Sequence, residues 1–233
     1  MRRLTILAMA IFMLLTPALA RAQSVDQSAN PPEEAAKADP SVEVIYFIYY
    51  GNFDCQVIEP KLESFIKNLP ENVHFEVLPV VVVRGAVGED EFYTVNQYAD
   101  LFFVLDYFGQ KKLLRDKIFQ TVMDTLANTG EFALTDINYQ MDFLDDYDLS
   151  MNEYREAIDS DKVDKQIEKA LDYIQKFNIF SVPSMVVNGK TLVSYNPDKG
   201  VDNFFVSVNE AIKNAANPPK TKVKPRTVSK DNK

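Results

Sequence analysis

The chain has 233 residues, of which 46% are hydrophobic and 25% are charged, with 12 prolines and only 7 glycines. This composition excludes collagen-like, low-complexity and wholly disordered proteins, and a chain of this length can bury enough apolar surface to be stable without disulfides. The formal net charge of -9 argues against nucleic acid as the main partner, because phosphate binding needs a basic face.

Residues 1–22 have the pattern of a secretory signal peptide. A basic start at Arg2 and Arg3 precedes an apolar run, and small residues before Gln23 form a cleavage site. The apolar run is too short to span a bilayer, although an uncleaved anchor is the alternative. We therefore expect a periplasmic bacterial protein whose mature chain starts near Gln23 and keeps no integral membrane segment.

The folded part is expected to begin after a flexible lead-in. Residues 23–40 are rich in Ser, Asn, Pro, Ala and Glu and show no apolar period. The next segment, Val42–Tyr50, is β-branched and aromatic throughout. This pattern predicts a central strand that is covered on both faces.

A helix and a second strand follow. Helical spacing extends over Asn52–Asn68, with an apolar stripe that includes Phe53 and Val57. Val73–Val83 predicts another buried strand. Pro79 indicates that this strand lies at a sheet edge or contains a bulge, because proline cannot donate a ladder hydrogen bond.

The middle of the chain predicts a series of amphipathic helices and its end predicts a hairpin and a last helix. The expected helices cover residues 92–107, 110–127, 135–145, 150–159 and 161–177. Asn188 and Gly189 join two short strands, Ser184–Val187 and Thr191–Ser194, and this dipeptide is a strong hairpin signal. The final helix is expected over Val201–Ala215.

Residues 216–233 form a basic tail after a strongly acidic body. We interpret the tail as disordered and solvated, and attraction to an acidic surface or to anionic lipid headgroups is the alternative. The order of elements predicts an α/β protein with a thioredoxin-like fold. Its thioredoxin-like domain would comprise residues 41–91 and 178–215, with residues 92–177 as an inserted helical domain.

Two segments resemble the DsbA-like periplasmic thiol:disulfide oxidoreductases. Tyr46–Pro60 (YFIYYGNFDCQVIEP) is similar to the family's aromatic strand, its Cys-x-x-Cys motif and the Glu-Pro helix that follows. Phe180–Lys190 (FSVPSMVVNGK) is similar to the family's cis-proline loop, strand and hairpin. The resemblance implies a thioredoxin-like fold and a relation to disulfide exchange.

The motif is degraded in this chain. Where the family has Cys-x-x-Cys, the sequence reads Asn52-Phe53-Asp54-Cys55, so that only the second cysteine remains. A site with one cysteine cannot cycle between dithiol and disulfide within itself. Cys55 is then a buried remnant, a monothiol nucleophile or a partner in an intermolecular disulfide.

The residues around the lost cysteine favour an inert site. Asn52 is expected to cap the helix by accepting from the N–H of Asp54 or Cys55, which contributes about 1 kcal/mol. The carboxylate of Asp54 disfavours a second negative charge nearby, so Cys55 should stay a protonated thiol. Glu59 corresponds by resemblance to a family glutamate thought to move protons at the buried cysteine; the alternative is a remnant acid with a local partner.

The segment Phe180–Lys190 suggests a binding function. The resemblance implies that the Val182–Pro183 peptide is cis and faces the helix, so that the preceding backbone can pair with an extended substrate. Such pairing needs no thiol. Phe53 and Asp54 would complete the binding surface. The alternative is that this loop keeps its form only because the turn requires it.

Other constellations predict no metal or cofactor. His74 is the only histidine, so metal ligation by a histidine cluster is not expected. A Ser-His-Asp or Cys-His site near Cys55 is not expected either, because a histidine in a strand is more often structural. Gly85–Asp90 lacks the Gly-Lys-Ser/Thr ending of a phosphate loop and is interpreted as the crossover into the helices. The acidic residues between Asp142 and Asp148 are interpreted as solvated surface, with a cation site as the alternative.

Three functions remain open from the sequence. The first is a periplasmic protein without dithiol oxidase activity that binds extended peptide or protein segments at the Asn52/Val182–Pro183 surface. The second is a thiol:disulfide oxidoreductase that acts through Cys55 alone or with an external cysteine. The third is a non-catalytic subunit of a cell-envelope assembly. Whether the protein is an enzyme, and its oligomeric state, are left open.

Overall fold

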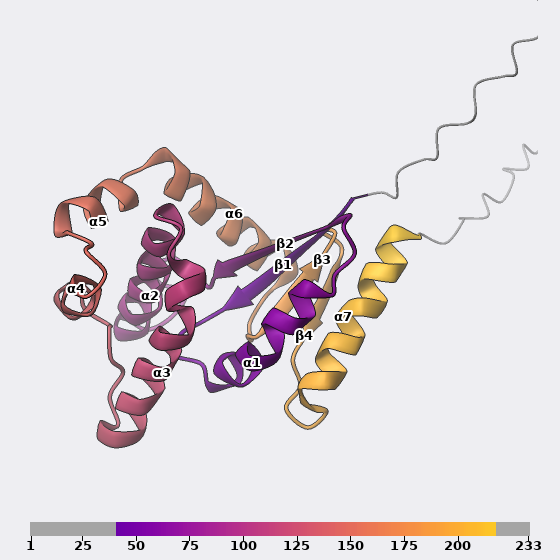
Figure 1. Ribbon diagram of the computed structural model, residues 1–233, viewed down its shortest axis with the longest axis horizontal. Helices are drawn as coiled ribbons and strands as arrows, with labels where there is room; N and C mark the ends of the chain where they lie inside the picture. The colour runs from indigo at the N-terminus through magenta and orange to yellow at the C-terminus, as the bar shows by residue number, and fades with distance from the viewer. Residues whose placement is uncertain (1–40, 218–233) are drawn as a thin grey trace, which may run out of the picture. The chain divides into compact units, whose positions relative to one another are not determined.

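The computed structural model describes residues 41–217, which form an α/β fold around a four-stranded sheet (Figure 1). The strands are Val42–Ile48 (β1), Val73–Pro79 (β2), Ser184–Val187 (β3) and Thr191–Ser194 (β4). The helices are Phe53–Lys67 (α1), Glu89–Tyr107 (α2), Lys111–Thr129 (α3), Ile137–Asp145 (α4), Met151–Ile158 (α5), Asp161–Phe177 (α6) and Gly200–Ala216 (α7). The α/β class predicted from the sequence is confirmed.

The sheet has the order β2-β1-β3-β4. β1 pairs parallel with β2 and antiparallel with β3, and β3 forms a hairpin with β4. β2 lies at the sheet edge, as Pro79 predicted, but the strand also ends there. The prediction that it continues to Val83 is wrong. The partner strand β1 ends at Ile48, whose carbonyl still accepts from the N–H of Val80 at 2.8 Å, and the backbone of Val82 then bonds to the side chain of Asn96 and not to a strand.

Helices cover both faces of β1, which explains its continuous apolar sequence. α1 and α7 lie along one face, where the rings of Phe65 and Phe205 stack at 4.5 Å between centroids (Figure 1). α6 covers the other face, where the ring of Phe47 lies 6.3 Å from that of Tyr173. β1 is therefore buried on both sides, as predicted.

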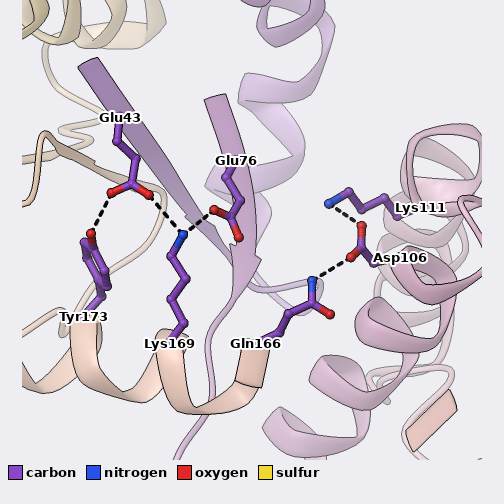
Figure 2. Close-up of polar contacts among 7 residues, drawn as sticks. All are labelled: Glu43, Glu76, Asp106, Lys111, Gln166, Lys169 and Tyr173. Carbon is purple, nitrogen blue, oxygen red and sulfur yellow. Dashed lines mark hydrogen bonds and ion pairs between the residues drawn. The ribbon is translucent and has the colours of Figure 1, made fainter. Parts of the chain in front are cut away.

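An ion-pair network fixes α6 across β1 and β2 (Figure 2). The Nζ of Lys169 lies 3.0 Å from Oε1 of Glu43 on β1 and 2.5 Å from Oε2 of Glu76 on β2. The hydroxyl of Tyr173 donates to the other oxygen of Glu43 at 2.7 Å. One helix is thereby bound to two neighbouring strands through side chains on a single face.

The C-terminal end of α2 is held in the same way. Asp106 accepts from the side-chain amide of Gln166 on α6 and forms an ion pair with Lys111 on α3, each at 2.6 Å (Figure 2). At the start of α6, the Ser160 hydroxyl accepts from the N–H of Val163 at 3.3 Å. Ser160 therefore caps α6.

The five helices α2–α6 follow one another between β2 and β3, in the part of the chain where five helices were predicted. Their assignment to a separate inserted domain, residues 92–177, stays a prediction. α7 ends at Ala216, one residue into the predicted tail. The predicted signal peptide and lead-in, and the tail from residue 218 on, lie outside the described residues. Within residues 41–217, no helix combines the length and apolarity that crossing a membrane requires.

Candidate functional site

Three chain segments meet at one end of the sheet, where strands end or begin. Asn52 follows β1, Val80–Val83 follow β2, and Val182 precedes β3. Because β1 and β2 run parallel and β3 runs antiparallel to them, the C-terminal ends of β1 and β2 and the start of β3 lie at the same end of the sheet. A cavity of about 740 Å³ lies there, and Asp54 contributes to its lining.

Asn52 caps α1. Its backbone is extended, with φ -111° and ψ 119°, and its Oδ1 accepts from the backbone N–H of Cys55 at 3.0 Å. The capping role predicted from the sequence is confirmed, and Cys55 is the donor of the two considered. A neutral amide therefore satisfies an N–H group at the positive end of the helix dipole.

The turn between β1 and α1 places the Tyr49 ring against the backbone. The N–H of Asn52 donates to the carbonyl of Tyr49 at 3.0 Å. A Cβ at Gly51 would come within 2.6 Å of the Tyr49 ring, so glycine allows this close approach. Tyr49 also lines the cavity, and burial together with the nearby charge of Glu91 raises its pKa to about 12.

Cys55 is completely buried in the first turn of α1. Burial raises the pKa of its thiol, a hydrogen bond to the Tyr49 backbone opposes this shift, and the negative charges of Glu59 and Asp54 add to it. The thiol is therefore protonated at neutral pH. The sequence argument attributed this to Asp54, whereas burial is the larger cause.

Glu59 is paired with an arginine from another helix. The Nε of Arg115, on α3, donates to Oε2 of Glu59 at 2.5 Å, and both side chains are largely buried. Oε1 of Glu59 has no hydrogen-bond partner within the described part of the chain. Burial raises the pKa of Glu59 to about 7, although Arg115 lowers it. The structure thus gives this acid the local partner that one of the two sequence interpretations expected.

Phe53 points away from the core. Its side chain is 65% exposed and does not line the cavity, which contradicts the predicted apolar stripe that included it. Val57 on the same helix is also exposed. The physical reason is that no other element of the described chain covers this part of α1.

The Val182–Pro183 peptide is cis. Pro183 is buried, and its carbonyl accepts from the N–H of Tyr195 at 3.0 Å. Val182 lines the cavity, and its own N–H and C=O form no hydrogen bond with any other residue of the range 41–217. The adjacent Phe180 side chain is 93% exposed.

The cavity brings together only part of the predicted site. Asn52, Asp54 and Val182 line it. The predicted residues that do not line it are Phe53, Cys55, Glu59 and Pro183. Sequence reasoning missed Arg115, because a partner 56 residues away leaves no local signal, and it missed Glu91, which lines the cavity from the first turn of α2.

Known proteins resemble the chain over most of its length, although no family model matches it. The thiol:disulfide interchange protein DsbA of Pseudomonas syringae pv. tomato is 27% identical over 195 residues, which cover 82% of this chain and 85% of that protein. The chain is a DsbA homologue. The protein of the same name from Azotobacter vinelandii is 27% identical over 165 residues, or 70% of this chain and 71% of that protein.

Solved structures agree with this assignment at the level of the fold. The crystal structure of Pseudomonas aeruginosa DsbA matches with a TM-score of 0.60 and 22% identity, covering 81% of this chain and 90% of that chain. A complex of Proteus mirabilis DsbA with a non-covalently bound peptide matches with a TM-score of 0.56 and 17% identity, covering 79% and 92%. The predicted thioredoxin-like fold is confirmed, and the single cysteine of this DsbA homologue is consistent with a degraded Cys-x-x-Cys motif.

Proposed function

We propose that this DsbA homologue is a periplasmic protein that lacks dithiol oxidase activity and binds extended peptide or protein segments at the surface around Asn52 and Val182–Pro183. One observation carries the proposal. Asn52 caps the helix at the position of the first motif cysteine, while the N–H and C=O of Val182, which have no partner in the described part of the chain, lie beside the cavity.

The loss of oxidase activity follows from the chemistry of exchange. Disulfide exchange needs an attacking thiolate and a second sulfur that accepts or resolves the bond. Asn52 supplies no sulfur, and Cys55 is buried and protonated. The same burial argues against a monothiol mechanism through Cys55, because its sulfur would have to reach a mixed disulfide.

Peptide binding is supported by the backbone at Val182. An extended chain can pair with free N–H and C=O groups at the edge of a structure, and this pairing needs no particular side chain. The adjacent cavity of about 740 Å³ can take up a side chain of the bound segment. The Proteus mirabilis relative, which holds a peptide non-covalently, adds support from a protein of the same fold.

A periplasmic location is supported by the signal-type pattern of residues 1–22. The envelope-subunit hypothesis would use as its docking element either the acidic helical face or the basic tail, which lies outside the described residues.

The two parts of the proposal are tested separately. The mature chain is incubated with a reduced, unfolded disulfide protein, and we expect no oxidative refolding above the background rate. Substantial turnover by the wild type would contradict the loss of activity.

Binding is measured by fluorescence anisotropy with a dye-labelled peptide, Gly-Gln-Val-Phe-Val-Gln-Gly. We expect Ala86→Trp, which fills the cavity, to weaken binding about tenfold, equivalent to about 1.4 kcal/mol. Val206→Trp, on the exposed face of α7, is the matched control and should bind like the wild type. Equal affinities of the two variants would rule out this cavity as the binding site.

A further inference from the structure

Among residues 41–217, two carboxylates and no basic side chain line the cavity. Asp54 contributes from the first turn of α1 and Glu91 from the first turn of α2. Neither carboxylate forms an ion pair with any residue of the range 41–217. Neither charge is therefore neutralised in a direct ion pair within that range.

Two basic residues are next to lining residues in sequence, Arg84 and Lys176, and both have other partners. The Nζ of Lys176 donates to the Gly189 carbonyl at 3.3 Å and lies 5.2 Å from the centroid of the Phe177 ring. Arg84 follows the Val80–Val83 segment, and its guanidinium lies 2.9 Å from Glu89 and donates to the hydroxyl of Tyr93 at 3.2 Å. The same group lies 4.8 Å from the centroid of the Phe92 ring. The guanidinium of Arg84 is therefore paired with Glu89 and the aromatic rings, and it forms no ion pair with Asp54 or Glu91.

The rest of the wall is mainly apolar and comes from several parts of the fold. Its apolar side chains include Val81, Val87, Val95, Leu171, Ile174 and Ile179. The cavity therefore combines an apolar wall with two negative groups. A lysine or arginine fits both features, because its aliphatic stem can lie along apolar surface while its cationic head stays near water and carboxylates.

We propose that the site selects extended segments in which an apolar side chain is flanked by Lys or Arg. The inference rests on the proposed function and deepens it by naming the class of peptide that is bound. Opposite charges across an interface raise affinity and reject like-charged partners. Because the pairs would be partly exposed, the preference falls as salt increases.

The test compares three peptides that differ only in charge. The neutral peptide Gly-Gln-Val-Phe-Val-Gln-Gly is measured beside versions in which both Gln are replaced by Lys or by Glu. Each peptide is measured at low ionic strength and in 0.5 M NaCl, because the screening length falls below about 10 Å at salt concentrations above about 0.1 M. We expect the Lys version to bind about tenfold more tightly than the Glu version at low salt, since each exposed pair is worth about two- to fivefold. In 0.5 M NaCl this ratio should shrink to about twofold or less.

Paired variants locate the charges responsible. Asp54→Asn with Glu91→Gln should abolish the difference between the Lys and Glu peptides. Asp142→Asn with Glu210→Gln removes the same charge from exposed positions outside the cavity and should keep the preference. This control separates the cavity carboxylates from the general acidity of the protein.

The outcomes distinguish this inference from the function on which it rests. Equal binding of all three peptides, or loss of the preference in both double variants, overturns the charge selection and leaves peptide binding in place. Absence of binding by all three peptides overturns the proposed function itself. A Lys preference that disappears only in the Asp54/Glu91 variant supports both.

Discussion

At the start of α1, the backbone N–H groups can stabilise any acceptor placed before them, whether a thiolate or an amide oxygen. Asn52 provides a neutral acceptor that already has the extended backbone of a cap. The helix therefore keeps its start, and the buried Cys55 keeps its place below it. Replacing the first cysteine by Asn removes the atom that exchanges electrons without removing the geometry around it.

This interpretation predicts a stability effect at Asn52 that is independent of any redox role. Asn52→Ala should lower the free energy of unfolding by about 1 kcal/mol, because the N–H of Cys55 loses its acceptor. Asn52→Ser, which keeps a capping oxygen, should be close to the wild type. Urea unfolding followed by circular dichroism measures both. An alanine variant as stable as the wild type would mean that the cap contributes nothing.

At the scale of the elements, the pair Glu59–Arg115 is the buried polar contact that joins α1 to α3. Burial favours the neutral form of Glu59, and its pKa of about 7 lies above the ordinary value of 4.5. Because the pKa is raised in the folded state, protonation of Glu59 stabilises the fold fully below about pH 4.5. This contribution is lost as the pH rises through about 7.

Removing the guanidinium of Arg115 should increase the loss of folding stability that ionised Glu59 causes at high pH. Arg115→Met leaves a buried carboxylate without its partner, so we expect a loss of about 3 kcal/mol at pH 8 and a smaller loss at pH 5.5, where Glu59 takes up a proton. Asp116 raises the same pKa and is unchanged in this variant. Lys112→Met, at an exposed position of α3, should change stability by no more than about 0.5 kcal/mol.

Urea titrations of the two variants at pH 5.5 and pH 8 decide the matter. If Arg115→Met lost the same stability at both values, Glu59 would not be the group that titrates.

The existence and order of the elements could be predicted from the sequence because each has a strong local period. The five middle helices and the Asn188-Gly189 hairpin follow from such patterns, and so does the cap at Asn52. Periodicity also placed Phe53 and Val57 on the apolar stripe of α1. It could not show that the stripe is uncovered at the start of the helix, because that depends on which elements pack there.

The parts of the site that were missed depend on contacts between distant segments. Arg115 reaches Glu59 from another helix, and Glu91 reaches the cavity from the start of α2. A single sequence carries no signal for such pairs, since an arginine or glutamate on an amphipathic helix has the same local pattern when it faces water. The end of β2 at Pro79 is a property of the same kind, because it follows from where the partner strand β1 ends, and the run of valines after Pro79 gives no sign of it.

At the scale of the whole molecule, the cavity depends on segments that are far apart in the chain. Its walls come from the start of α1, the segment after β2, helices α2 and α6, and the loop before β3. Lys169 holds α6 against β1 and β2 through Glu43 and Glu76 (Figure 2). The surface that we propose for peptide binding is therefore maintained by the packing of the helices on the sheet, and not by the degraded motif alone.

This arrangement predicts that a sulfur restored at position 52 would report what the site binds. In the double variant Asn52→Cys/Cys55→Ser, the new thiol lies at the N-terminus of α1, where unpaired N–H groups favour the thiolate. This thiolate attacks a disulfide of a bound chain, which forms the mixed disulfide and releases the other sulfur of that chain as a thiolate. The sulfur of Cys55 that could resolve the adduct is removed, so captured chains should accumulate in the periplasm. Non-reducing electrophoresis and mass spectrometry identify them.

The specificity of capture is what tests the site. Val206→Cys/Cys55→Ser places an exposed thiol on α7, away from the cavity, and Cys55→Ser alone carries no thiol. We expect the variant with sulfur at position 52 to capture a distinct set of chains, in which the bonded cysteine lies near apolar and basic residues. If the α7 thiol captured the same chains in the same amounts, collision with any exposed sulfur would explain the adducts, and the surface around Asn52 and Val182 would have no binding role.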